Sequence, residues 1–553
     1  MGESKRGPKL PAVNRWSPRK RPVERQVERP FQRPVDALRS AIDWTIVGAF
    51  GVVLGVGMAR HEPWRDELQA WMIARASRTP GQLVRNLQHE GHPIGWYALL
   101  WPFARAVSSV WMLQLIAWCV SVSTAALVMA RAPWSRLTRA LIIFGYFFVF
   151  EYGVLARSYA LGLLCLLGAL TSMRPRYRWV PLGIALAALS LTSAFGAIIA
   201  AALLIGAVVD QRQVLRSLEV RRRLSMTASL LASAAIASWI QARPRPSTAS
   251  FNTWNFSKDS HLASTAIAAI FRGIVPLPRL QHSWWNTSIA DGHTGIAAIA
   301  GIALLVSIAW AFRTSPAALT VWTLGTVSVV GLLYLKLRQA DAARYYGHIF
   351  MLLIAAAWIH AEPTPAAVES EVGDLELHNE RRGMHPRKRP TRWFAILLAG
   401  QCAFGLVAVS IDVANPFTDA QSTAAWIVTH GGKHPGIIGC DDAATSSVAG
   451  HLNRRIFYRQ GAVSGTFIEW NRRRRHDFAN LATAVRRASA GTRSLVLYVS
   501  NHRVDALTKR LRFTARNGIV ADEHYWVYDL TTTTEAELTA PALRGQQDPC
   551  RTL

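Results

Sequence analysis

Acidic residues are scarce in this sequence. Of 553 residues, 34 are Asp or Glu and 62 are Lys or Arg, so the formal net charge is +28. Most of the basic residues flank long uncharged runs and do not form one face, as nucleic-acid recognition would require. The pattern excludes an ordinary cytosolic enzyme and gives no reason to expect a nucleic-acid partner.

Cysteines and nucleotide-binding motifs are also lacking. The chain has 5 cysteines, too few for a disulfide scaffold. Cys119, Cys165 and Cys402 lie in apolar runs, which leaves Cys440 and Cys550 as a candidate pair outside the membrane. Neither GxGxxG nor GxxxxGKS/T occurs, so nothing in the sequence calls for a nucleotide.

Apolar runs of membrane length fill most of the chain up to residue 411. They lie at 42–59, 106–130, 140–155, 158–173, 179–209, 224–241, 295–312, 317–335, 345–359 and 393–411. The run 179–209 is long enough for two helices separated by a turn at 192–196, or for one tilted helix. Two helices place the arginine-rich short loops on the same side as the basic N-terminus. We therefore expect eleven spans, with the N-terminus inside and the C-terminus outside.

This topology divides the chain into four parts. Residues 1–40 form a disordered basic cytoplasmic arm, and 41–411 form the transmembrane domain. The transmembrane domain has an outer loop at 61–105, whose segment 92–107 is expected to lie along the interface, and a cytoplasmic linker at 361–392. Residues 412–530 form an extracytoplasmic domain, and 531–553 form a disordered tail.

The extracytoplasmic domain is predicted to be a small α/β domain. Helices are expected at 419–430, 444–452, 476–488 and 504–513, and strands at 436–439, 456–458 and 494–499. Such alternation is typical of a mostly parallel sheet. The predicted fold class is thus a polytopic α-helical membrane protein with a C-terminal α/β domain.

An adjacent acid pair, Asp66 and Glu67, follows the first span directly. Pro63 can begin a helix, and its first turn favours carboxylates whether or not they have a function. Their position at the outer membrane surface suits a lipid-borne substrate and favours a function. Consecutive helical residues point about 100° apart, so one acid should face a cavity and the other a neighbouring loop.

Other polar residues interrupt the apolar segments near the same surface. Glu151 and Arg157 either pair to tie two helices together or face a charged ligand. Arg338 and Arg344 lie at the outer ends of two late spans, where they either anchor a phosphate or snorkel to the interface. We interpret His89 and His92 as turn residues and not as metal ligands, because no nearby Cys or third His completes a set.

These features together resemble the GT-C superfamily of polyprenyl-phosphate-dependent glycosyltransferases, most closely the bacterial family 39 type. The likeness covers roughly 42–411 and is most specific at Asp66-Glu67 and at 152–159. It implies that Asp66 is the catalytic base and that Arg157 and Tyr159 form an Arg-x-Tyr element. Many relatives carry an acid two residues before this arginine, where this chain has Leu155, so the second acid would be Glu151 or absent.

The resemblance implies a membrane glycosyltransferase at the outer face of the inner (plasma) membrane. It would transfer a sugar from a polyprenyl-phosphate donor to a hydroxyl of a glycan, lipid or protein acceptor, with inversion at the anomeric carbon. Membrane lipids would be further partners. Glu67 would orient Asp66 or complete a metal site. The remaining candidates would bind substrate, and they are Glu151, Arg157, Tyr159, Arg338, Arg344 and His92.

Cofactors and competing functions stay open at this point. No cofactor is required, although a divalent metal, Mg²⁺ or Mn²⁺, is compatible with the acids. The alternatives are a polytopic transporter or flippase of lipid-linked sugars, with Glu151 and Arg157 lining its path, and an oligosaccharide ligase or polymerase. The C-terminal domain is expected to shape acceptor access and not to supply the base.

Overall fold

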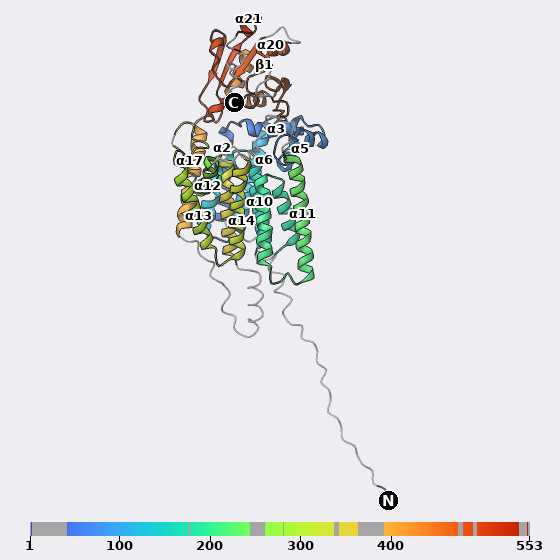
Figure 1. The fold of residues 1–553 in the computed structure, drawn as a ribbon, viewed down its shortest axis with the longest axis vertical. Coiled ribbons are helices and arrows are strands. Elements are labelled where there is room, and N and C mark those ends of the chain that lie inside the picture. The colour runs from blue at the N-terminus through green and yellow to red at the C-terminus, as the bar shows by residue number, and fades with distance from the viewer. Residues whose placement is uncertain are drawn as a thin grey trace.

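The structure is a computed structural model. It describes residues 2, 41–174, 177–243, 260–279, 281–336, 342–362, 392–473, 479–489, 495–540, 543 and 550. A body of long helices carries a smaller domain at one end, with short helices between the two (Figure 1). The basic arm 1–40, except residue 2, and most of the linker 361–392 lie outside the described residues.

Every predicted span corresponds to helix within the described residues. The helices are α2 (Ala41–Arg60), α6 (Trp111–Arg131), α7 (Arg136–Ile143) continued by the π-helix η2 (Phe147–Val154), α8 (Ser158–Met173), α9 (Trp179–Ser190), α10 (Ala194–Asp210), α11 (Leu218–Ala242), α13 (Thr294–Ala311), α14 (Pro316–Lys336), α15 (Ala343–Ala361) and α17 (Arg392–Ala414). By length and composition, 7 helices of the described chain can cross a membrane. Shorter apolar helices pack among them, as expected of a multi-pass membrane protein.

The long run 179–209 is a helical hairpin. Helix α9 ends at Ser190 and α10 begins at Ala194. The Ser193 side chain caps α10 by accepting a hydrogen bond from the Gly196 amide at 2.9 Å. The two-helix interpretation is therefore confirmed.

One apolar helix was not expected. Helix α12 (Ser260–Ile274) lies in the segment that the sequence assigns to an outer loop. It packs against α13 and α15 and approaches α13 closely, since a Cβ added at Gly301 would lie 2.8 Å from the Ile267 carbonyl oxygen. Its 15 residues, which include Arg272, are too few to span a bilayer alone, which is why a search for membrane-length runs misses it.

Short helices, among them α3 (Arg65–Ala76) and α5 (Gly95–Ala106), lie between the helical body and the C-terminal domain (Figure 1). Helix α4 (Pro80–Asn86) falls between these two in the chain. Helix α5 covers most of the predicted interfacial segment 92–107 and is not among the membrane-length helices. Helix α3 begins directly after α2, so it brings the predicted acid pair to the top of the helical body.

The C-terminal domain is an α/β domain with a mixed sheet. Its elements are α18 (Ala420–His430), β1 (Gly436–Gly439), α19 (Asp442–Leu452), β2 (Ile456–Tyr458), β3 (Val463–Gly465), α20 (Leu481–Ser489), β4 (Val496–Ser500), η3 (Asp505–Arg510), β5 (Leu511–Ala515), η4 (Ala521–Glu523), β6 (Tyr525–Asp529) and α21 (Glu535–Leu538). The strand order is β3-β2-β1-β4-β6-β5.

Two details of the predicted sheet are wrong. Strand β1 pairs in parallel with β2 and with β4, while the other three pairs are antiparallel. The helix predicted at 504–513 is a short 3-10 turn followed by β5. In β5, Leu511 and Phe513 alternate with the exposed Arg512 and Thr514, which is the period of a strand.

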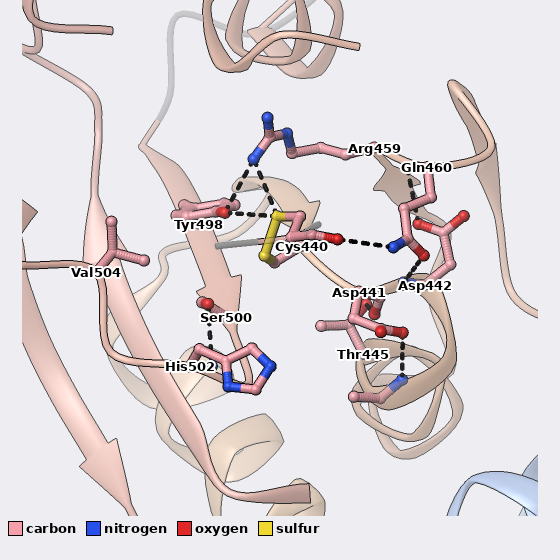
Figure 2. Close-up of a disulfide and its surroundings, with 12 residues drawn as sticks. Cys440, Asp441, Asp442, Thr445, Arg459, Gln460, Tyr498, Ser500, His502 and Val504 are labelled. Atoms are coloured by element: carbon pink, nitrogen blue, oxygen red, sulfur yellow. Dashed lines mark hydrogen bonds between the residues drawn. A yellow bond between two sulfur atoms is a disulfide. The ribbon is translucent and has the colours of Figure 1, made fainter. Parts of the chain in front are cut away.

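A disulfide joins Cys440, at the end of β1, to Cys550 and confirms the candidate pair (Figure 2). Arg459 donates hydrogen bonds to the Tyr498 hydroxyl at 3.1 Å and to the Cys550 sulfur at 3.0 Å. The segment 531–553 is therefore not disordered throughout. It contains α21, and its Leu538 is buried in the core beside the disulfide.

The C-terminal domain rests on α3. The Gln69 side chain donates to the Ile468 carbonyl oxygen at 3.0 Å and accepts from the Ile468 amide at 2.9 Å. The Arg65 guanidinium pairs with Asp522 at 2.5 Å, and the Arg65 amide donates to Glu523 at 3.1 Å. The domain is thus fastened to the helix that carries the acid pair.

Loss of the disulfide should destabilise the C-terminal domain. We expect Cys550→Ser to lower its free energy of unfolding by about 2–5 kcal/mol, because the cross-link limits the unfolded chain. Denaturant unfolding of the purified protein would measure this. Cys119→Ser, which removes an unbonded thiol, is the control. Equal stability of Cys550→Ser and wild type would contradict the prediction.

Candidate active site

Asp66 and Arg157 meet at the junction of the helical body and the C-terminal domain. Asp66 lies in the first turn of α3, and Arg157 lies between η2 and α8. The Arg157 Nη1 donates to Asp66 Oδ2. The Asp66 side chain is 29% exposed and that of Arg157 9%. The sequence predicted both residues for the site, and the structure brings them together.

The charge of Asp66 is set by its cationic neighbours. Burial alone would raise the pKa of Asp66, but Arg157 and then Arg344 hold it well below its usual range. Asp66 is therefore a carboxylate over the whole physiological pH range. In this arrangement it is a weak base, since the proton it would accept competes with the guanidinium charge.

Trp64 is the platform on which the cations gather. The guanidinium carbons of Arg65, Arg157 and Arg344 lie 5.4, 5.9 and 5.7 Å from its ring centroid. Arg157 also lies 5.4 Å from the ring of Tyr159, the second predicted residue of the Arg-x-Tyr element. Trp64 was not among the residues predicted for the site, although it directly precedes Arg65 and the acid pair.

Glu67 points away from Asp66 and is completely buried. Its Oε1 accepts from the Ala156 amide at 2.6 Å, directly before Arg157, and its Oε2 accepts from the Trp64 amide at 3.1 Å. Glu67 thus binds the loop that presents Arg157 while its neighbour Asp66 faces that arginine. The geometry agrees with the expectation that the two acids diverge.

His61 holds Glu67 from the other side. Its Nε2 lies 3.0 Å from Glu67 Oε2, and its Nδ1 lies 3.1 Å from both carboxylate oxygens of Asp412 on α17. Burial alone would lower the pKa of His61, but Asp412 and Glu67 raise it to about 10. A charged imidazolium therefore ties the ends of α2, α3 and α17 together.

Glu151 does not pair with Arg157, so the interpretation of a structural ion pair is wrong. Its Oε2 accepts from the Tyr146 hydroxyl at 2.9 Å and from the Trp285 indole at 3.1 Å. Arg157 has Asp66 as its carboxylate partner instead. The Trp285 ring packs on Trp64 with centroids 4.8 Å apart. Glu151 therefore helps to position the Trp64 ring through its hydrogen bond with Trp285.

His92 and an unexpected acid, Glu90, complete the surroundings of the ion pair. Burial, followed by the charge of Arg157, lowers the pKa of His92 to about 4, so His92 is neutral. Burial raises the pKa of Glu90 to about 8, and its Oε1 accepts from Gln69 at 2.7 Å. Nothing in the local sequence marks Glu90, because its burial depends on the distant C-terminal domain.

Two arginines remain among the predicted site residues. Arg344 lies in the first turn of α15 and belongs to the site, whereas Arg338 lies outside the described residues. Among the described residues, no group of three or more His, Cys, Asp or Glu is arranged to hold a metal ion. Divalent metals prefer clustered oxygen ligands, so a site crowded by guanidinium groups does not fit Mg²⁺ or Mn²⁺. We assign no step to a metal.

The chain is similar to a solved structure, at a distant level. No family model and no curated protein matches the chain. The crystal structure of ArnT from Cupriavidus metallidurans bound to undecaprenyl phosphate is similar with a TM-score of 0.48 and 10% identity, over 91% of this chain and 100% of that chain. A likeness this distant says nothing about chemistry, which rests on the residues of this chain.

The charged state of His61 predicts how stability depends on pH. Its folded pKa of about 10 lies above the model-peptide value of 6.5. Its contribution is therefore complete below about pH 6.5 and is lost as the pH rises towards 10. Thermal unfolding should show wild type losing more stability between pH 7 and 10 than His61→Gln. The exposed His430→Gln is the control and should follow wild type. Parallel curves for wild type and His61→Gln would contradict a stabilising role for charged His61.

Proposed function

We propose that this chain is a GT-C-type membrane glycosyltransferase. It transfers a sugar from a polyprenyl-phosphate donor to an acceptor hydroxyl, and Asp66 is the general base. The observation that carries the proposal is the contact of Asp66 with Arg157, with Arg344 and Trp64 beside it, where membrane-length helices end. A carboxylate and two arginines at this depth match a substrate that is charged and attached to lipid.

The arginines supply the phosphate site. Planar guanidinium groups bind phosphate through paired N–H donors, and the indole of Trp64 holds their faces in place. Arg157 is nearly buried, so a phosphate that reaches it loses water and gains a strong interaction. The prenyl chain would extend along the apolar helices that end at this site.

Phosphate binding also prepares the base. An anion on Arg157 and Arg344 offsets the positive charge that lowers the pKa of Asp66, so the carboxylate becomes more basic when the donor is present. Asp66 then takes the proton from the acceptor hydroxyl as that oxygen bonds to the anomeric carbon. The bond from this carbon to the phosphate oxygen breaks, and the arginines hold the leaving group. Direct displacement of this kind inverts the anomeric centre.

The disulfide supports an extracytoplasmic location for the site. Disulfides persist in oxidising compartments, and Cys440–Cys550 lies in the domain that rests on α3. We therefore place the active site and the C-terminal domain on the outer side of the inner (plasma) membrane, opposite the basic arm. A glycan, a lipid or a protein reaching this surface is the acceptor.

The C-terminal domain lies where an acceptor would approach. Its loop at Ile468 binds Gln69, three residues after Asp66 on α3, and Trp470 hydrogen-bonds the buried Glu90. In the described residues, Asp66 and Arg157 contact each other, Arg65 and the rings of Trp64 and Tyr159, and none of these residues belongs to the C-terminal domain. Its role in the proposal is to shape access to the base.

Asp66→Asn tests the base directly. We expect transfer from a radiolabelled polyprenyl-phosphate sugar to fall about a hundredfold or more, because a general base acts in the transition state. Binding of polyprenyl phosphate should be as tight as in wild type or tighter, since the neutral Asn side chain competes with the phosphate for Arg157 less strongly than the Asp66 carboxylate does. Glu67→Gln is the comparison. Near-normal transfer by folded Asp66→Asn would overturn the assignment, and movement of lipid-linked sugar without transfer would favour a flippase.

Arg157→Lys tests the phosphate site. Lysine keeps the positive charge but loses the planar fork, so polyprenyl-phosphate affinity should fall about tenfold, while Arg157→Ala should lose more. Binding measured by isothermal titration in detergent would show this. Arg313→Lys is a matched control, because Arg313 lies over the distant Trp310 ring and outside the site. Unchanged affinity in Arg157→Ala would return Arg157 to a structural role.

A further inference from the structure

A groove between α9 and α11 lies far from the candidate active site. Near the site, the Gln241 side chain of α11 donates to the His92 carbonyl oxygen at 3.1 Å. The groove begins on the same helix at Arg222, nineteen positions earlier. At about 1.5 Å per residue this separation is about 28 Å, which is close to the whole hydrocarbon thickness of a bilayer. The groove therefore belongs to the opposite face of the membrane.

The groove has the length of one lipid leaflet. It has a volume of about 930 Å³ and extends along α11 from Arg222 to Ser233. These eleven steps of helix measure about 16 Å, or about half of the hydrocarbon core. Its apolar walls face outward, since Val180 is 66% exposed and Met226 59%. An acyl chain of that leaflet would fit along it.

Small residues create the depth of the groove. Gly183 of α9 has no side chain to fill the space beside α11, where an added Cβ would be in ordinary van der Waals contact, 3.5 Å from the Thr227 Cα. Ser225, Ser229 and Ser233 line the α11 side. Helix α11 has the lowest buried share of the membrane-length helices of the described chain, at 17%. A lipid chain in the groove would cover part of a helix that the protein leaves exposed.

Cations gather at one end of the groove. Arg178, Arg222 and Arg223 line it there, and Glu219 is the carboxylate that pairs with Arg223, at 2.7 Å. Tyr177 and Trp179 stack at the same end with ring centroids 4.9 Å apart, as aromatic residues do at a membrane interface. The apolar length thus ends in positive charge at headgroup level, which complements an anionic headgroup.

We propose that this groove is a binding site for one anionic phospholipid of the leaflet opposite the active site. Its phosphate would lie among Arg178, Arg222 and Arg223, and one acyl chain would lie between α9 and α11. The lipid would brace α11, whose other end contacts the loop that carries His92. The site needs neither the sugar donor nor the acceptor, so it stands independently of the proposed glycosyltransferase activity.

Lipid retention tests this proposal. The full-length protein is reconstituted in nanodiscs of phosphatidylcholine with an equal part of phosphatidylglycerol, extracted into detergent, and analysed for bound lipid by native mass spectrometry. We expect wild type to retain phosphatidylglycerol over phosphatidylcholine. The double substitution Arg222→Gln with Arg223→Gln should reduce retained phosphatidylglycerol about twenty-five-fold, since each cation that contacts the headgroup contributes a factor of about five. Equal retention of the two lipids by wild type would overturn the proposal.

Matched variants separate the groove from general surface charge. Arg216→Gln with Arg221→Gln makes the same change of charge nearby but outside the lining, and should retain phosphatidylglycerol as wild type does. Ser229→Trp should fill the groove and expel the lipid with all arginines in place, whereas Ala232→Trp, outside the lining, should not. Equal losses in the two arginine pairs, or full retention by Ser229→Trp, would overturn the proposal.

Discussion

A charged histidine between two buried carboxylates holds the candidate site together. His61 contacts Glu67 and Asp412, and Glu67 in turn binds the amide of Ala156. Through these contacts the end of the first long helix, the start of α3, the loop before Arg157 and the last long helix share one charge network. A buried charge of this kind is tolerated only when its partners are in place, so the network fixes their relative positions. The positions of Asp66 and Arg157 follow from it.

In the structure, the proposed base Asp66 and the proposed phosphate ligand Arg157 bind each other, so neither is available to a substrate. Without a donor, the guanidinium neutralises the carboxylate and lowers its pKa. A phosphate would take over the guanidinium and leave the carboxylate available to the acceptor. The base would then be strong only when the leaving group is already bound, which would limit attack by other hydroxyl groups. The C-terminal domain is fastened at Gln69 and Arg65 to α3, the helix that carries Asp66.

Much of this arrangement could be predicted from the sequence because it depends on local patterns. Apolar runs identified the long helices, and Arg157 was predicted because it interrupts such a run. Asp66 was predicted because it directly follows the first span and because the resemblance implies an acid there. The partners of Glu67 and Glu151 could not be predicted, since His61, Asp412 and Trp285 meet them only through the fold. Helix α12 is too short to be recognised as a span. The mixed sheet was missed because β3 and β6 were not predicted as strands and the start of β5 was predicted as helix, and these three strands make the antiparallel pairs.

The pH dependence of transfer tests the coupling of phosphate binding to the base most directly. The acid limb of kcat/KM reports Asp66 in the free protein, and that of kcat reports it in the donor complex. Bound phosphate should raise the pKa of Asp66, so the limb of kcat should lie at higher pH than that of kcat/KM, by about one unit or more. Coincident limbs, or a kcat limb at lower pH, would contradict the coupling.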